Sequence, residues 1–378
     1  MIPLSLPDIG EEEIVAVREA LLSGWLTSGP RTAEFEAAVR ALTGAKHAVA
    51  CNSGTSAIFL AILAEGIRGG VVLPSFTFVA SANAVRTAGA RPVFADVDPE
   101  DGMLTPASIE AALVPGTEAV LVVHYAGQIA DMDPIADLCR RKGLRLIEDS
   151  AETLGGTYRG RHPGSWGTAC FSFFPTKNVT TGEGGMVTTA DAAVAARVRA
   201  LLAHGIEKDL HEREKSARPW ERSAVVPGYN LRMPDAAAAI GIVQMRKLAR
   251  MNDRRRAIAA RYAAGLAGLP LDLPVERPGR VHVYQMYCPR VREGVDRDAL
   301  VEELRRRGVG ASVHWEPAVH EMPAYRDLGV ADGDLPATAR TVGRVFSLPM
   351  FPGLADEQVD RVIEALREVL RGRSSTRG

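Results

Sequence analysis

The sequence has few cysteines and no obvious arrangement of metal-binding residues. The four cysteines form no C-x-x-C pair, and the eight histidines form no H-x-x-x-H pair. We therefore expect neither a zinc site nor a disulfide framework. The cysteines, all far apart, are Cys51, Cys139, Cys170 and Cys288.

The sequence also lacks an excess of charge and any long apolar run. Its 45 lysines and arginines nearly balance its 46 aspartates and glutamates, and the formal net charge of −1 argues against a nucleic acid as partner. No apolar stretch approaches the length of a membrane span, and residues 1–15 contain no basic segment followed by an apolar one. We therefore expect no membrane partner, no secretion signal and a cytoplasmic location.

Residues 47–149 alternate short apolar runs with stretches of helical periodicity. Strands separated by short helices indicate right-handed crossovers and a largely parallel sheet that is covered on both faces. The predicted strands lie at 47–51, 70–74, 91–97, 118–125 and 144–149, and the predicted helices at 55–66, 77–89, 106–114 and 132–143.

A chain of 378 residues is too long for one ordinary core, which predicts two domains of unequal size. We expect a large domain over residues 1–245, with an N-terminal arm at 1–30, and a small α+β domain over 246–378. The remaining predicted elements are a surface loop at 204–225, a long helix at 233–266, a strand at 281–291, and helices at 298–308 and 356–370.

Two polar elements fall at the carboxyl ends of predicted strands, where open parallel sheets bind their ligands. In "CNSGTSA" a helix begins near Gly54, so free N–H groups, the helix dipole and the hydroxyls of Thr55 or Ser56 suit a phosphate. A plain N-cap explains the same residues. Asp149 ends the strand "LRLIED", either as an acid above the ligand or as a solvated carboxylate.

Two further elements complete a set. Phe76 and Phe78 follow the strand "GVVLP" and belong either to the core or to a planar ligand. Lys177 follows "FSFFPT"; alone it reads as a solvated loop lysine, but a partly desolvated lysine is a nucleophilic amine. Enzymes hold pyridoxal 5′-phosphate (PLP) with four such parts: a phosphate site, an aromatic ring face, an acid at a strand end and a lysine.

These motifs resemble the DegT/DnrJ/EryC1/StrS family of sugar aminotransferases, which are fold-type I PLP enzymes. The matching text includes "NSGTSAI", "IEDSAETLGGTYRG", "FSFFPTKNVTTGEGGMVTT" and "GYNLRMPDAAAAIGIVQ" and covers most of residues 20–245, in order. Residues 311–325 match more loosely. The resemblance implies an α/β fold with a mostly parallel mixed sheet between helices in the large domain, and a small C-terminal α+β domain.

The resemblance also assigns cofactor contacts. It makes Lys177 the Schiff-base lysine and Asp149 the partner of the pyridinium nitrogen. It places Glu152 opposite the phenolic oxygen of the cofactor, where many relatives have Gln or His. It implies a homodimer with shared active sites, because Asn230 would reach the phosphate of the neighbouring subunit. The other implied cofactor contacts are Phe78 as the stacking ring, and Gly54, Thr55, Ser56 and Ser172 at the phosphate.

The implied reaction is transamination from L-glutamate to a nucleotide-linked keto sugar. Glu152 favours a 4-keto-6-deoxy sugar, since some relatives with that substrate carry Glu here. The implied substrate contacts are Trp25, Thr27, Arg232, His314 and His320, and for the two histidines a structural role explains the sequence equally well.

Two alternatives remain open from the sequence. One is a PLP-dependent sugar dehydratase of the same family, in which the resemblance would place a histidine where Lys177 stands. The other is a non-catalytic PLP-binding regulatory protein, against which the complete set of cofactor residues speaks.

Overall fold

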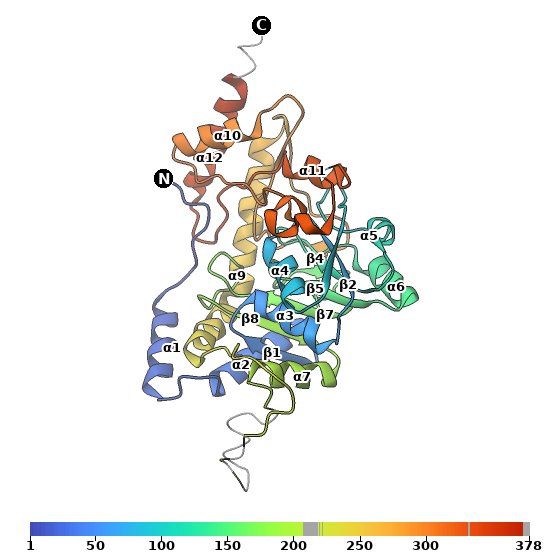
Figure 1. Cartoon of the computed structure of the whole chain (residues 1–378). Coiled ribbons are helices and arrows are strands. Elements are labelled where there is room, and N and C mark those ends of the chain that lie inside the picture. Colours follow the sequence, from blue (N-terminus) through green and yellow to red (C-terminus); the bar gives the residue numbers. More distant parts are fainter. Residues whose placement is uncertain (207–217, 219, 221, 332, 373–378) are drawn as a thin grey trace.

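The computed structural model describes residues 1–206, 218, 220, 222–331 and 333–372 (Figure 1). Its centre is a seven-stranded sheet in which β8 runs antiparallel to both of its neighbours, β1 and β7, while the other pairs are parallel. The predicted mixed, mostly parallel sheet is confirmed. In spatial order the strands are β1 (His47–Cys51), β8 (Gly185–Thr189), β7 (Thr168–Ser172), β5 (Arg145–Asp149), β4 (Thr117–Val123), β2 (Gly70–Pro74) and β3 (Arg91–Ala95).

Helices cover both faces of this sheet because its strands are apolar on both sides. On β4, Leu121 packs into one hydrophobic cluster while its neighbours Val120 and Val122 pack into another. Such two-sided burial is typical of central parallel strands. One face carries α3 (Gly54–Ala64), α4 (Val79–Thr87) and α7 (Ala192–Leu202); the other carries α2 (Pro30–Thr43), α5 (Pro106–Ala112), α6 (Met132–Lys142) and part of α9 (Asp235–Leu266).

The helix α9 connects the large sheet with a second hydrophobic cluster. Its first half packs against α1 (Glu11–Leu22) and α2, and its second half runs toward the C-terminal helices (Figure 1). Ile258 and Tyr262 of the second half are buried among C-terminal residues. Ile2 joins this second cluster, and its N–H donates to Gly308 O. The cluster is built mainly on α10 (Arg297–Arg306), α12 (Asp356–Gly372), β9 (Leu271–Asp272) and β11 (Arg290–Val291).

Not every C-terminal residue packs with the second cluster. Val319, Tyr325 and Leu335 lie in the cluster of α3 and α4 on the large sheet. The division of the chain at residues 245 and 246 therefore stays a prediction. The short elements of this region are η1 (Val319–Glu321), η2 (Pro323–Leu328) and α11 (Pro336–Val342).

The strand predicted over 281–291 is wrong for most of its length. The structure has only β10 (Arg280–Val281), which pairs with β6 (Thr157–Tyr158), and β11 at the far end. Between them Tyr284 adopts a left-handed φ of 43°, which breaks the extended backbone. The apolar side chains there divide between two environments: Tyr287 and Val291 lie in the second hydrophobic cluster, whereas Met286 and Cys288 pack near Phe76 and Ala126 at loops of the large sheet.

The predicted loop at 204–225 lies largely outside the described residues. The other predicted helices and strands are present, with ends shifted by a few residues. Within the described part of the chain, no helix is long and apolar enough to span a membrane.

Phe35 offers a test of the core on the α2 side of the sheet. Its ring is fully buried and lies edge-on to Phe173, with 4.8 Å between centroids. We expect Phe35→Ala to destabilise the fold by about 3–5 kcal/mol, because the cavity cannot close fully. Thermal unfolding should show a lower midpoint for Phe35→Ala than for Phe35→Leu, and an unchanged midpoint for Phe35→Ala would contradict this packing.

Candidate active site

The candidate site lies at the edge of the sheet where the parallel strands β2, β4, β5 and β7 have their carboxyl ends. Ligands of open α/β sheets bind at this edge. The segments that follow these strands are Ser75–Phe78, His124–Ala126, Ser150–Glu152 and Phe173–Lys177.

Lys177 and Glu152 form the central pair of this edge. The amine Nζ of Lys177 lies 3.1 Å from Oε1 of Glu152, and the backbone N–H of Ala126 donates to Oε2 at 2.8 Å. Glu152 is 5% exposed, so its carboxylate is held by these donors rather than by bulk water. The lysine predicted from the sequence is thus not a solvated loop residue.

Asp149 ends β5 and is also buried. Ser81 Oγ donates to Oδ2 of Asp149 at 2.7 Å, and the N–H of Ala151 donates to Oδ1 at 3.2 Å. Burial raises the pKa of Asp149, whereas these two hydrogen bonds and the positive charge of Lys177 act to lower it. The carboxyl group is therefore held in a fixed orientation at the strand end, and the charge of Lys177 interacts with it electrostatically.

Gly54 and Ser172 lie against each other at the start of α3. A Cβ added to Gly54 would come within 2.7 Å of the Cβ of Ser172, so only glycine permits this approach. The N-cap is Ser53, whose Oγ accepts from Ser56 N at 3.1 Å and lies 2.9 Å from Ser56 Oγ. Thr55 is exposed. The helix end thus has its cap and still presents N–H groups of the first turn.

The two aromatic candidates have different environments. Phe76 is 1% exposed and packs edge-on against Tyr125 and Trp315. Phe78, at the N-cap of α4, is 57% exposed. Only Phe78 therefore has a ring face available to a planar ligand.

The two histidines also differ. His314 pairs through Nδ1 with Ser347 Oγ at 2.7 Å, and burial lowers its pKa while the opposite charges of Glu152 and Lys177 act on it. His320 is 1% exposed, and its Nδ1 lies 2.7 Å from Ser75 Oγ. The geometry thus places His314 near the Lys177–Glu152 pair and gives His320 a packing role, which does not support a substrate contact by His320.

The remaining predicted residues form a separate group near the end of β1. Trp25 Nε1 donates to Ser28 O at 3.1 Å, and Ser28 Oγ donates to Met233 O at 2.7 Å. Thr27 and Asn230 are exposed, and Arg232 is half-buried. In the described residues, no hydrogen bond or ion pair joins Trp25, Thr27, Asn230 or Arg232 to Lys177, Asp149 or Glu152.

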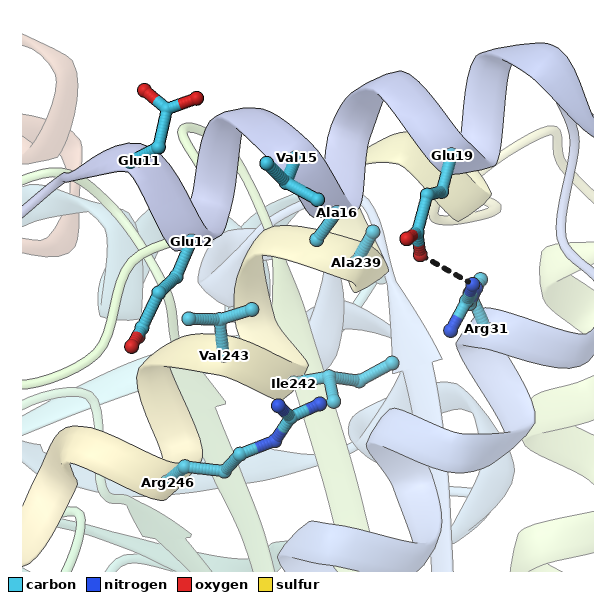
Figure 2. A pocket seen from close by; sticks show the side chains of 10 residues that line it. All are labelled: Glu11, Glu12, Val15, Ala16, Glu19, Arg31, Ala239, Ile242, Val243 and Arg246. Carbon is cyan, nitrogen blue, oxygen red and sulfur yellow. Dashed lines mark hydrogen bonds and ion pairs between the residues drawn. The ribbon is translucent and has the colours of Figure 1, made fainter.

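A hollow elsewhere on the molecule is not a competing site. It has a volume of about 360 Å³ and lies between α1, α2 and α9 (Figure 2). Its wall includes Val15, Ile242 and Val243, and Glu19 pairs with Arg31 at 3.4 Å. It has no lysine and none of the predicted site residues in its lining, so it lacks the chemistry for PLP.

Sequence reasoning missed the residues that hold the acidic groups. Ser81 lies in α4, which follows β2, whereas Asp149 ends β5, and β4 lies between these two strands. Ala126 contributes only its backbone. A serine in the first turn of a helix after β2 carries no motif of its own. It could be found only by recognising that β2 and β5 flank β4 in the sheet.

The donor set fits PLP. The amine of Lys177 can take up an aldehyde, buried Asp149 can pair with a ring nitrogen, and the N-terminus of α3 beside Ser172 can hold a phosphate. The close contact of Gly54 with Ser172 leaves no room for a side chain at that seat. Fold and site together define the class of fold-type I enzymes that use PLP.

Comparison with known proteins gives the family. The chain belongs to the DegT/DnrJ/EryC1/StrS aminotransferase family, which it matches over residues 7–367. The family is PLP-dependent, so the chain is a PLP-dependent transaminase.

Solved structures of similar proteins agree. DesV of S. venezuelae, in complex with a ketimine intermediate, is 37% identical over 95% of this chain and 94% of its own, with a TM-score of 0.88. DesI, solved in the presence of its TDP-sugar product, is 36% identical over 100% and 95%, with a TM-score of 0.89. A Streptococcus pneumoniae protein assigned as a sugar aminotransferase, in its PMP form, is 30% identical over 98% and 100%, with a TM-score of 0.93.

The hydrogen bond from Ser81 generates a prediction about pH. Because Ser81 lowers the pKa of Asp149, the variant Ser81→Ala should raise that pKa further above its usual value. The ionised carboxylate would then be lost at a higher pH on acidification. We expect the acid limb of the kcat/KM profile for the amino donor to move to higher pH.

The control for this experiment is Ser108→Ala in α5. The hydroxyl of Ser108 also takes part in a hydrogen bond, accepting from Thr105 N at 3.0 Å, but Ser108 lies outside the site. If the acid limbs of wild type, Ser108→Ala and Ser81→Ala coincide, Ser81 does not tune Asp149.

Proposed function

We propose that this chain transfers the amino group of L-glutamate to the keto group of a nucleotide-linked sugar, with a 4-keto-6-deoxy sugar favoured. The observation that carries the proposal is the Lys177 amine held 3.1 Å from Glu152, beside the buried Asp149. The sugar is supported by the similarity to DesI, whose structure was solved with its TDP-sugar product. Lys177 speaks against the dehydratase, in which the family resemblance would place a histidine at this position. The complete set of cofactor residues and the match to an aminotransferase family speak against the regulatory protein.

Bound PLP supplies an electron sink for the carbanion formed when a substrate carbon loses its proton. The residues of the chain would hold and orient the cofactor and move the proton. Asp149 would pair through its carboxylate with the ring nitrogen and keep it protonated. Lys177 Nζ would take the proton from the substrate carbon. Phe78 would lie against the cofactor ring.

The start of α3 and Ser172 hold the phosphate in this proposal. The backbone N–H groups after Ser53 and the hydroxyls of Thr55 and Ser56 surround the seat that Gly54 keeps open. A doubly charged anion at this helix end gains from the positive end of the helix dipole.

Glu152 is proposed to act as the acidic partner of Lys177. It accepts one hydrogen bond from Ala126 N and one from Lys177 Nζ, on different oxygens. A carboxylate in this position can take a proton from the amine while its other oxygen stays fixed. It can also face the phenolic oxygen of the cofactor, in which case the two acidic groups share a proton.

We further propose a homodimer whose two sites are shared. Asn230 and Thr27 are exposed in the single chain, and Asn230 would reach the phosphate of the other subunit. Exposed apolar side chains in the same parts of the sequence support a covering partner. They are Leu21, Leu22, Leu26, Trp220, Val225 and Val226.

The proposed substrate contacts follow from the same arrangement. Trp25, Thr27 and Arg232 would come from the partner side, where a planar guanidinium suits a carboxylate or diphosphate. His314 would come from the same chain as Lys177, whose charge already acts on it.

The substrate proposal is tested by incubating the glutamate-treated enzyme with a panel of nucleotide keto sugars. Mass spectrometry should show the mass change of a carbonyl replaced by an amine for at least one 4-keto-6-deoxy sugar. If none of the nucleotide sugars yields an aminated product, the proposed acceptor is wrong, whereas the cofactor assignment still stands.

The role of Lys177 is tested by Lys177→Ala. We expect the rate of amino transfer from glutamate to fall by roughly 10²–10⁴-fold or more, because both the attachment point and the proton carrier are lost. The control is Lys247→Ala. Lys247 lies on α9, outside the site, and forms an ion pair with Glu13 of α1 at 2.8 Å. Full activity in Lys177→Ala would refute the mechanism.

The shared sites are tested by mixing two inactive variants. Lys177→Ala and Asn230→Ala homodimers should each be impaired, since each lacks one part of both sites. After unfolding and refolding together, mixed dimers would contain one complete site and activity should reappear. If the mixture stays as inactive as its components, Asn230 does not serve the neighbouring subunit.

A further inference from the structure

The residues on either side of Lys177 are fixed by amide side chains from outside its loop. Thr176 O, just before the lysine, accepts a hydrogen bond from Gln285 Nε2 at 2.9 Å. Asn178, just after it, donates through Nδ2 to Asn252 Oδ1 at 2.7 Å and to Val283 O at 3.3 Å. The lysine backbone is therefore held from both directions.

The segment Val283–Met286 also reaches the other member of the central pair. Its Val283 N donates to Gly127 O at 3.0 Å, and its Met286 N donates to Ala126 O at 3.3 Å. Ala126 N in turn donates to Glu152. One short segment is thus hydrogen-bonded to the backbone on both sides of the Lys177–Glu152 contact.

Gly127 allows this segment to approach. A Cβ at Gly127 would lie 2.7 Å from the backbone nitrogens of Tyr284 and Gln285, and the φ of Gly127 is +107°. A side chain at this position would push the segment away from Ala126.

Arg255 on α9 holds the same segment from behind. Its guanidinium Nη1 donates to Gln285 O at 3.1 Å and to Met350 O at 3.0 Å, and the residue is 2% exposed. Burial lowers the pKa of Arg255 to about 10, which leaves it charged at neutral pH. The buried guanidinium thus links the Val283–Met286 segment to the backbone at Met350.

The amide oxygens give independent support. Among the described residues, Gln285 Oε1 and Asn178 Oδ1 are buried and have no hydrogen-bond partner. A buried amide oxygen without a partner costs desolvation energy that no hydrogen bond offsets, so these two side chains can stabilise the structure only through their N–H groups. These N–H groups contact the Lys177 loop or the residues that anchor it. The two amides therefore act by holding that loop.

We propose that Gln285 and Asn178 are positioning residues that set the Lys177 amine against Glu152 and the cofactor aldehyde. The inference rests on the proposed function, in which Lys177 binds PLP covalently. It assigns to the irregular segment Val283–Met286 the task of aligning the reacting amine. Neither residue touches the reacting atoms itself.

The test compares Gln285→Met with wild type after reconstitution with PLP. Borohydride fixes cofactor that is covalently attached, and peptide mass spectrometry counts the Lys177 adduct relative to total bound cofactor. We expect the fixed fraction and kcat with glutamate to fall on the order of tenfold, because a displacement of about 1 Å is enough to misalign the amine. The KM for glutamate should change much less.

The matched control is Gln244→Met. Gln244 is a buried glutamine on α9 whose Nε2 donates to Asp8 O at 2.6 Å and to Glu13 Oε1 at 2.8 Å, so it anchors α1 instead of the lysine loop. It should lower the melting temperature and leave the Lys177 adduct unchanged. Asn178→Ala, the second positioning variant, carries the same expectation as Gln285→Met if the latter does not fold.

The outcomes separate the two proposals. If wild type forms no Lys177 adduct, the proposed function fails. If wild type forms it and both positioning variants match wild type in adduct and kcat, only the positioning inference fails. A loss shared equally by Gln244→Met would show a general effect of stability and would also overturn the inference.

Discussion

The contact between the Lys177 amine and the Glu152 carboxylate is the interaction on which the site depends. Neither charge is favourable in a desolvated position without the other, so the fold has to deliver both to one place. It does so with neighbouring parallel strands, since β5 leads to Glu152 and β7 leads to Lys177. Asp149 and Ser172 arrive at the same edge for the same reason.

Around this pair, the chain uses backbone atoms as much as side chains. Ala126 N donates to Glu152, and Thr176 O accepts from the side chain of Gln285. The carbonyl of Gln285 in turn accepts from Arg255 and joins these loops to α9. Backbone donors have little freedom once the fold is formed, which makes them suitable for holding an acid and an amine at a set distance. The large sheet and the second hydrophobic cluster are connected through this network.

The sequence allowed prediction of what is local. The alternating strands and helices and the lysine and acid at strand ends all follow from short motifs, and the sheet confirms their shared edge. Ser81 and Gln285 could not be predicted, because each acts across a large sequence distance and has no motif. The apolar alternation at 281–291 suggested a strand, but its hydrogen bonds go to loops. Asn230 and Arg232 stay predictions, since their proposed role involves a second chain.

The reversed direction of β8 has a consequence for how the site forms. Because β8 returns beside β7, Lys177 sits in the connection of an antiparallel hairpin, and Phe173 N already pairs with Gly184 O across its base. Closing this connection, residues 173–184, costs less chain entropy than bringing together segments that lie far apart in the sequence. Glu152, which faces the lysine, and the amides of Gln285 and Asn252, which anchor its loop, lie outside this connection in the sequence. The nucleophile can thus be shaped locally and early in folding, whereas its alignment awaits the whole chain.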